Sequence, residues 1–344
     1  MSGAAECVVE VTRGAVLESR HRVHAAVVDA GGRLRAFAGD PELVTFFRSA
    51  AKPLQALPLV DDGAVERYGL TLEELALCCG SHSGSAAHTR VAERILEKAG
   101  VTAEALACGP HPPFDEEAQR LLAEAGLEPG RLHNNCSGKH AGMMMLARAR
   151  GWDTAGYERP EHPVQRRMLA EVARWTRMPV EAIALGTDGC GVPCFALPLR
   201  QMALSFAAFA AAARAGERGP STVVEAMTAH PEMVAGSGRV CTALMRQARG
   251  RLFAKVGAEG VYCVGVPGAE LGIAIKVEDG QTRAVAPAVA GVLRELDLIS
   301  EDDFGALHRH VFREVTNTRG EGTGEVRPSI RLRTPDAETE AEGA

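Results

Sequence analysis

The placement of strand patterns at both ends of this chain, with helical patterns between them, constrains its fold more than any other feature. Alternating apolar and polar residues, typical of strands, occur at residues 7–14, 19–29, 33–39, 251–257, 260–267 and 271–280. From Pro41 to about Arg249 the apolar spacing is mainly helical, and helical patterns return at 286–296 and 301–314. The chain therefore lacks the regular strand–helix alternation of a doubly wound sheet.

We predict instead a mixed α/β (α+β) fold, in which one antiparallel sheet is built from both chain ends around a large inserted helical region. The sheet part is expected at about 1–50 and 250–334, and the helical part at about 51–249, so that residues 1–334 form a single unit. The last residues, 335–344, are acidic and lack large apolar side chains, which predicts a disordered tail.

Composition and charge limit the cellular compartments and the binding partners that are expected for this chain. The formal net charge of −6 is mild and spread along 344 residues, which argues against a nucleic-acid or anionic-membrane surface. No apolar run is long enough to span a bilayer, and the first residues lack the basic and apolar regions of a signal peptide. We expect a cytoplasmic protein with reduced thiols, because the nine cysteines are odd in number and follow no secretion signal.

Lysine is rare in this chain, which makes each lysine informative. Only five of the 38 basic residues are lysines, so arginine supplies most of the solubilising positive charge. Burial can make a lysine neutral, and a neutral lysine can act as a base or a metal ligand, whereas arginine keeps its charge. Lys52, Lys139 and Lys255 lie in short motifs of small and polar residues. These three are therefore candidates for chemistry.

The first motif, RSAAKP, places Ser49 three residues before Lys52 at the start of a helical pattern. Residues three apart share one face of a helix, so the hydroxyl and the amine could meet there. A serine becomes a nucleophile when a base removes its proton, and full burial can lower a lysine pKa by about 3–5 units. The alternative is structural, with Ser49 capping the helix and Lys52 in solvent. The motif alone leaves both interpretations open.

Two further polar stretches adjoin apolar helices. The stretch CCGSHSG, at residues 78–84, contains Ser81 and is either a simple turn or a candidate site loop. The stretch NNCSGKH gathers Cys136, Lys139 and His140 ahead of a helix N-terminus, where backbone N–H groups favour anions. Its glycine spacing differs from that of a Walker A motif. A polar run of this length before an apolar helix indicates a site more strongly than Ser-x-x-Lys does.

Two later motifs complete the set. The stretch GTDGCGVPC contains Asp188 and Cys190 among glycines that permit unusual backbone angles. Its cysteines supply half a zinc site by residue type, with no Cys-x-x-Cys pair to complete it. Lys255, in Lys-Val-Gly at the end of a late strand, resembles the Lys-Thr-Gly element of serine β-lactamases and penicillin-binding proteins, which also use Ser-x-x-Lys. A surface turn is the alternative for this element.

The ordered set RSAAKP, CCGSHSG, NNCSGKHAGM, GTDGCGVPCFALPL and AKVGAEGVYCVG resembles the rhizobial-type L-asparaginases, also called class 3 or asparaginase II-like. The resemblance runs from the first strands to the stretch NTRGEGTGEVR, and NCSGKHAGM and GTDGCGVP are its most specific parts. It implies a serine β-lactamase-like fold, a homodimer, and hydrolysis of L-asparagine to L-aspartate and ammonia.

The resemblance also implies roles for individual residues. It implies a catalytic set of two Ser–Lys pairs, Ser49 with Lys52 and Ser81 with Lys255. It implies a zinc ion close to these pairs, not strictly required for turnover, with the ligands Cys136, Lys139 and Cys190. The positions that match the surrounding substrate-binding residues are Arg48, His140, Asp188 and Cys241.

The hypothesis that results is an L-asparaginase, an amidohydrolase that acts on a linear amide. Lys52 would take the proton of Ser49, which attacks the side-chain amide carbon, and ammonia would leave after protonation through Ser81 and Lys255. Which serine attacks first stays open, because the two pairs are chemically alike. The alternatives are another acyl-serine amidohydrolase, such as a glutaminase or a β-lactam-binding enzyme, and a catalytically inactive zinc-dependent amino-acid sensor.

Overall fold

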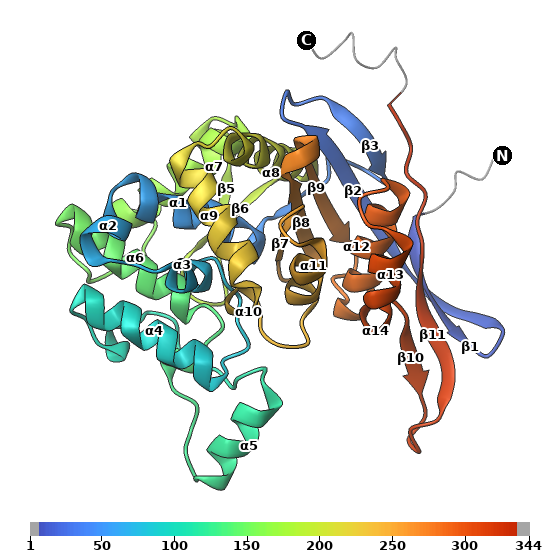
Figure 1. Ribbon diagram of the computed structural model, residues 1–344, viewed down its shortest axis with the longest axis horizontal. Helices are drawn as coiled ribbons and strands as arrows, with labels where there is room; N and C mark the ends of the chain where they lie inside the picture. The colour runs from blue at the N-terminus through green and yellow to red at the C-terminus, as the bar shows by residue number, and fades with distance from the viewer. Residues whose placement is uncertain (1–6, 336–344) are drawn as a thin grey trace.

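A large antiparallel sheet forms one side of the molecule in the computed structural model, which describes residues 7–335 (Figure 1). Its eight strands are β1 (Val8–Arg13), β2 (Val16–Asp29), β3 (Leu34–Ala38), β7 (Phe253–Val256), β8 (Val261–Val266), β9 (Leu271–Val277), β10 (Arg313–Thr316) and β11 (Gly322–Ser329). Their order is β10-β11-β1-β2-β9-β8-β7, with β3 beside β2, and every pairing is antiparallel. The predicted sheet from both chain ends is confirmed. The predicted tail, apart from Pro335, lies outside the described residues.

The long strand β2 ties the two ends of the chain together. Its first half pairs with β1, so that Arg22 lies opposite Val8. Its second half pairs with β9, beginning with Val23 opposite Val277, and carries β3 on its other edge. One strand therefore belongs both to the first hairpin and to the late strands, which include β7 and its Lys255.

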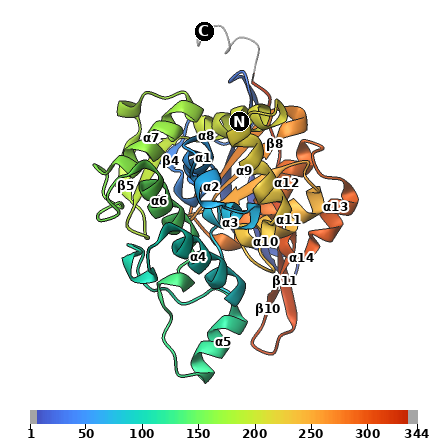
Figure 2. The ribbon, with the colours of Figure 1, turned by 60° about the vertical axis from the view of Figure 1, so that its left-hand side comes forward.

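The chain between β3 and β7 is mainly helical, as the sequence predicts, and lies on one side of the sheet in Figure 2. The helices there are α1 (Lys52–Asp61), α2 (Ala64–Tyr68), α3 (Leu72–Cys78), α4 (Ala86–Ala99), α5 (Glu116–Glu124), α6 (Ser137–Arg150), α7 (Pro163–Thr176), α8 (Leu199–Arg214), α9 (Arg218–Ala229), α10 (Pro231–Val234) and α11 (Val240–Ala248). Helix α1 packs against α6, α7 and α9, whereas α8 packs on strands β2, β8 and β9. Within residues 7–335, no helix combines the length and the apolar character needed to cross a membrane.

The late part of the chain departs from the predicted pattern. Helix α12 (Thr282–Glu295) matches its prediction, but the helix expected over Glu301–Glu314 is two short ones, α13 (Glu301–Ala306) and α14 (His308–Val311). The prediction of a helix through Glu314 is wrong, because Arg313–Thr316 pairs with β11 as a strand. Strand β10 has only four residues, and a segment this short contains too few residues for a clear alternation of apolar and polar side chains.

A second, three-stranded sheet was not predicted from the sequence. It has the order β4-β6-β5 and consists of β4 (Val44–Phe46), β5 (Ala184–Thr187) and β6 (Pro193–Pro198). Strands of this length contain too few residues for a clear alternation of apolar and polar side chains. The sheet matters for function because β5 and β6 enclose the loop of Cys190, and β4 leads directly to Ser49.

A cluster of aromatic rings connects the helical region to the large sheet. The ring of Phe206 on α8 lies 6.2 Å from that of Phe47 and 5.4 Å from that of Phe253, measured between ring centroids. Phe47 precedes the turn of Ser49, and Phe253 shares a face of β7 with Lys255 because alternate residues of a strand point the same way. The aromatic core therefore fixes the backbone on both sides of the candidate site.

Candidate active site

Ser81 is held between two buried lysines. Its Oγ accepts hydrogen bonds from Lys255 Nζ at 2.8 Å and from Lys52 Nζ at 3.0 Å. The exposed fractions are 4% for Ser81, 1% for Lys52 and 0% for Lys255. The structural alternatives, a solvated Lys52 and a surface turn at Lys255, are therefore wrong. Both of these rare lysines are therefore buried beside a serine.

Local packing explains how Ser81 reaches this place. It follows the C-terminus of α3, and its backbone N–H donates to the carbonyl of Val234 at 2.8 Å. The preceding Gly80 lies so close to the loop that a Cβ there would be 2.5 Å from the carbonyl oxygen of Met233. Only glycine allows this approach, so Gly80 fixes Ser81 against the segment that contains α10.

Ser49 lies in the same region but makes different contacts. It belongs to the 3₁₀ turn Arg48–Ala51 that precedes α1 and is half-buried. Among the described residues, the amine of Lys52 bonds to Ser81, to the Gly80 carbonyl at 2.5 Å and to Cys136 Sγ at 3.3 Å, and not to Ser49. The structure thus brings the four catalytic candidates to one region, with Ser81 as the serine that both lysines contact.

The environment of Lys255 lowers the pKa of its amine. Burial is the main cause, and the charge of Lys52 the next, of a fall in the pKa of Lys255 to about 7. A lysine with this pKa is largely neutral just above neutral pH, and a neutral amine can accept a proton. The Ser-x-x-Lys hypothesis required a lowered pKa of Lys52, but this lowered pKa is that of Lys255, in the Lys-Val-Gly motif on β7.

A second buried cluster contains the three predicted metal ligands. Lys139 Nζ lies 3.0 Å from Cys190 Sγ, and Cys136 shares a hydrogen bond with Cys190. That hydrogen bond first, and Lys139 next, lower the pKa of Cys190 to about 4, and the neighbouring thiolate raises the pKa of Lys139. Between residues 7 and 335 no three His, Cys, Asp or Glu side chains are grouped to hold a metal. A metal at this cluster would need Lys139 as its third protein ligand.

The predicted substrate-binding residues Arg48 and Asp188 lie beside this second cluster. Arg48 donates to Asp188 Oδ1 through Nη2 at 2.9 Å and Nε at 3.2 Å. Burial would raise the pKa of Asp188, but Lys139 and then Arg48 outweigh it, so that this pKa is lowered. The backbone of Arg48 has a φ of +50°, a left-handed conformation that costs free energy for a residue with a Cβ. The ion pair therefore stabilises a strained turn immediately before Ser49.

His140 is fully buried in α6. Its Nδ1 lies 2.7 Å from the hydroxyl of Tyr157, and its Nε2 has no hydrogen-bond partner among the described residues. Burial first, and Lys139 next, lower the pKa of His140 to about 3, so the ring is neutral.

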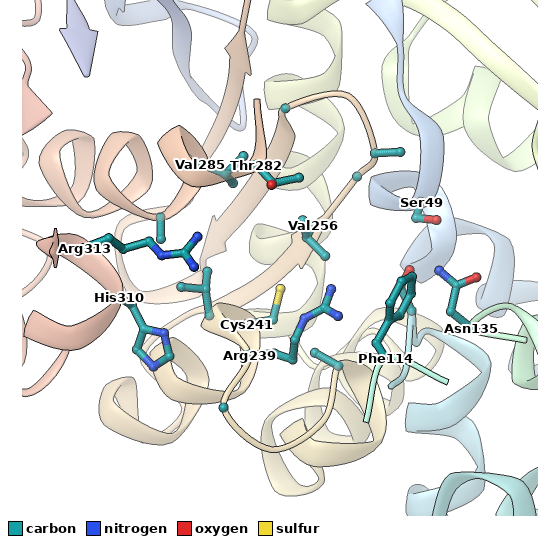
Figure 3. A pocket seen from close by; sticks show the side chains of 18 of the residues that line it. Ser49, Phe114, Asn135, Arg239, Cys241, Val256, Thr282, Val285, His310 and Arg313 are labelled. Carbon is teal, nitrogen blue, oxygen red and sulfur yellow. The ribbon is translucent and has the colours of Figure 1, made fainter. Parts of the chain in front are cut away.

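One cavity of about 790 Å³ opens onto the two serines (Figure 3). Ser49, Ser81 and Cys241 are the predicted site residues that line it, whereas Arg48, His140 and Asp188 do not. Asn135 lies beside Ser49 in Figure 3, and the predictions missed Arg239, whose guanidinium points into the cavity. The only sequence signal for Arg239 is the loop Gly-Ser-Gly that precedes it at the start of α11.

Comparisons with known proteins place this site in a family. Solved structures similar to the chain include a protein named Mglu, with 16% identity, 87% of this chain and 66% of that chain covered, and a TM-score of 0.37. A β-lactamase from Mycobacterium bovis has 16% identity, coverages of 79% and 94%, and a TM-score of 0.36. A simvastatin synthase from Aspergillus terreus has 14% identity, coverages of 74% and 86%, and a TM-score of 0.36.

This chain thus spans about two thirds of the length of Mglu. The comparison with curated proteins gives no match. The family model described as L-asparaginase II matches residues 9–328, which include both serines, all three buried motif lysines and both cysteines of the second cluster. The chain therefore belongs to the L-asparaginase II family.

Proposed function

We propose that this protein hydrolyses the side-chain amide of L-asparagine, releasing ammonia and L-aspartate through an acyl-serine intermediate. One observation carries the proposal: Ser81 accepts hydrogen bonds from two buried lysines in a cavity that Ser49 also lines. The Ser81 hydroxyl lies beside an amine whose pKa is near 7, and a second hydroxyl lines the same cavity, so a nucleophile, a base and an acid are available at one site. The family membership supports an amidohydrolase.

The two serines differ in exposure and in hydrogen-bond partners, so we assign different catalytic roles to them. Ser49 is the more exposed hydroxyl and no partner occupies it among the described residues, so we assign to it the attack on the amide carbon. Ser81 is engaged by Lys52 and Lys255, so we assign to this group the removal of the Ser49 proton and its delivery to the departing ammonia. Water then cleaves the acyl-enzyme with the same groups acting in reverse.

The cavity also offers a partner for the charged end of asparagine. Arg239 projects into it between the serines and the opposite wall (Figure 3), and its guanidinium suits a bidentate contact with the α-carboxylate. Cys136, Lys139 and Cys190 would hold zinc, since soft thiolates and a nitrogen donor fit that metal. When bound, zinc would supply a Lewis-acidic position for polar groups of the substrate.

Ammonia release from asparagine and glutamine, with zinc measured in the same sample, tests this proposal. Ser49→Ala and Ser81→Ala should each lower kcat for asparagine by at least ~10³-fold while the circular dichroism spectrum stays unchanged. Mass spectrometry of acid-quenched Ser81→Ala should find any trapped acyl group on the peptide of Ser49. Full activity of either variant would refute the site, and an acyl group on Ser81 of the wild type would reverse the assignment of the two serines.

A further inference from the structure

The cavity is much larger than free asparagine requires. Its volume of about 790 Å³ lies within the range of about 300–1,000 Å³ found for sites that hold drug-sized ligands. Ser49 lies at one end (Figure 3), whereas residues from α14 and β10 line the other. An amino acid bound at the serines would therefore leave the second end unused.

That second end is strongly basic. Arg309, His310 and Arg313 belong to the lining. In Figure 3, Arg239 lies between Ser49 on one side and His310 and Arg313 on the other. No aspartate or glutamate is among the described residues that line the cavity. Low-dielectric walls with charges of one sign raise the local concentration of ligands of the opposite sign. The whole cavity is therefore suited to an anionic ligand.

These positive charges have no counter-ion within the described part of the protein. Arg239, Arg309 and Arg313 take part in no ion pair there, whereas other arginines, such as Arg94 and Arg167, bind carboxylates of the same chain. Arg309 and Arg313 are exposed, which by itself would be ordinary for surface arginines.

A second observation comes from His310. Its Nε2 is buried and has no hydrogen-bond partner among the described residues, although it belongs to the lining of the cavity. A buried polar atom without a partner is costly unless a ligand or water satisfies it. Arg313 extends into the same space in Figure 3.

We propose that Arg309, His310 and Arg313 form a subsite for a second negatively charged group of the substrate. With the amide at the serines and the α-carboxylate at Arg239, the α-amino group is the position at which the substrate extends toward α14. The substrate class is then an asparagine whose amino group carries an acidic acyl group, and this assignment rests on the proposed function. Water would convert such a compound to the corresponding N-acyl aspartate and ammonia.

Two matched ligands test the subsite without requiring turnover. N-succinyl-L-aspartate and N-butanoyl-L-aspartate have acyl chains of the same length and differ in the terminal carboxylate. At low ionic strength, isothermal titration calorimetry should give about fivefold or tighter binding of the succinyl ligand, because the subsite charges are partly exposed and screened by salt. Arg309→Gln/Arg313→Gln should abolish this preference. Equal affinities in the wild type, no binding of either ligand, or a preference retained in the double variant would each overturn the subsite.

A control variant and a kinetic measurement separate this result from the proposed function. Arg148→Gln removes an exposed arginine of α6 that does not line the cavity, and it should keep the preference. Ammonia release from L-asparagine should be unchanged in the double variant, whereas kcat/KM for N-succinyl-L-asparagine should fall about fivefold or more. A wild type that binds the succinyl ligand selectively but releases no ammonia from asparagine would refute the hydrolase and support the subsite.

Discussion

Two fully buried lysine clusters lie next to each other in this protein, and they favour opposite protonation states of lysine. In the serine cluster, burial and the charge of Lys52 lower the pKa of Lys255 to about 7. In the cysteine cluster, Lys139 is also buried, but the neighbouring thiolate of Cys190 raises its pKa. Lys52 connects the two, with its amine 3.0 Å from Ser81 Oγ and 3.3 Å from Cys136 Sγ.

The comparison teaches that burial alone does not decide what a lysine does. Desolvation disfavours the charged form in both clusters, so the sign of the nearest neighbour determines the outcome. A like charge leaves Lys255 ready to accept a proton, as a base must. The opposite charge of the Cys190 thiolate favours the protonated form of Lys139. A metal ion that bound both side chains would displace the proton of the lysine. The first cluster is suited to proton transfer and the second to ligand binding.

The largest effect should follow from removing the base. Lys255→Met keeps the bulk of the side chain and should lower kcat for asparagine by about 10²–10⁴-fold, the usual contribution of a general base. Zinc content should stay unchanged, because the cysteine cluster is intact. Lys276→Met is the matched control, since Lys276 is a buried lysine of β9 whose amine donates to the backbone carbonyls of Val277 and Glu278. A Lys255→Met variant with more than a tenth of the wild-type kcat would contradict the role of the serine cluster.

Disrupting the cysteine cluster should affect zinc binding more strongly than it affects kcat. Cys190→Ala removes the thiolate that contacts both Cys136 and Lys139, so stoichiometric zinc should be lost. KM for asparagine should rise, and kcat should fall less than in Lys255→Met. Elemental analysis and steady-state kinetics on one preparation measure both. Cys194→Ala, at a buried cysteine in the following strand, should keep the metal. Zinc retained in Cys190→Ala would exclude the ligand set.

The pH dependence should report the protonation state of the serine cluster. In the proposed mechanism the neutral form of Lys255 is the base, and this form is present above its pKa of about 7 and lost below it. On the acid side, kcat/KM should therefore fall about tenfold for each pH unit below that midpoint. The same midpoint should persist in Cys190→Ala, because burial and Lys52 are the main causes of the lowered pKa. A profile that is flat from pH 6 to 8 would be inconsistent with Lys255 as the base.

Particular residues show how far the sequence could predict this site. The rarity of lysine and the flanking motifs identified Lys52, Lys139 and Lys255, and all three are buried. The pattern could not tell that Lys52 contacts Ser81, because the position of Ser81 depends on a backbone contact with Val234, far along the chain. Contacts of this kind depend on the tertiary fold, so the spacing of residues along the chain does not predict them.

The basic end of the cavity could not be predicted from the sequence, for a related reason. Arginine is abundant in this chain, so Arg309 and Arg313 do not differ from solvated surface residues by type. Their place in the cavity depends on the pairing of β10 with β11, in a segment where the sequence pattern predicted a helix through Glu314. The rarity of a residue type drew attention to three buried lysines, whereas a cavity surface assembled from several segments can be seen only in the fold.

The smallest effect should come from the ion pair between Asp188, beside the cysteine cluster, and Arg48, in the turn of Ser49. Asp188→Asn removes the carboxylate that binds Arg48, and because the pair is partly exposed the free energy of unfolding should fall by only about 1–2 kcal/mol. The pH midpoint of kcat/KM should not move, since Asp188 acts on Lys139 and is not among the causes of the pKa of Lys255. Urea denaturation and the pH profile of the same variant test both statements. A shifted midpoint would mean that the clusters are electrostatically coupled through the Arg48 turn, and the contrast between them would then be a property of one extended network.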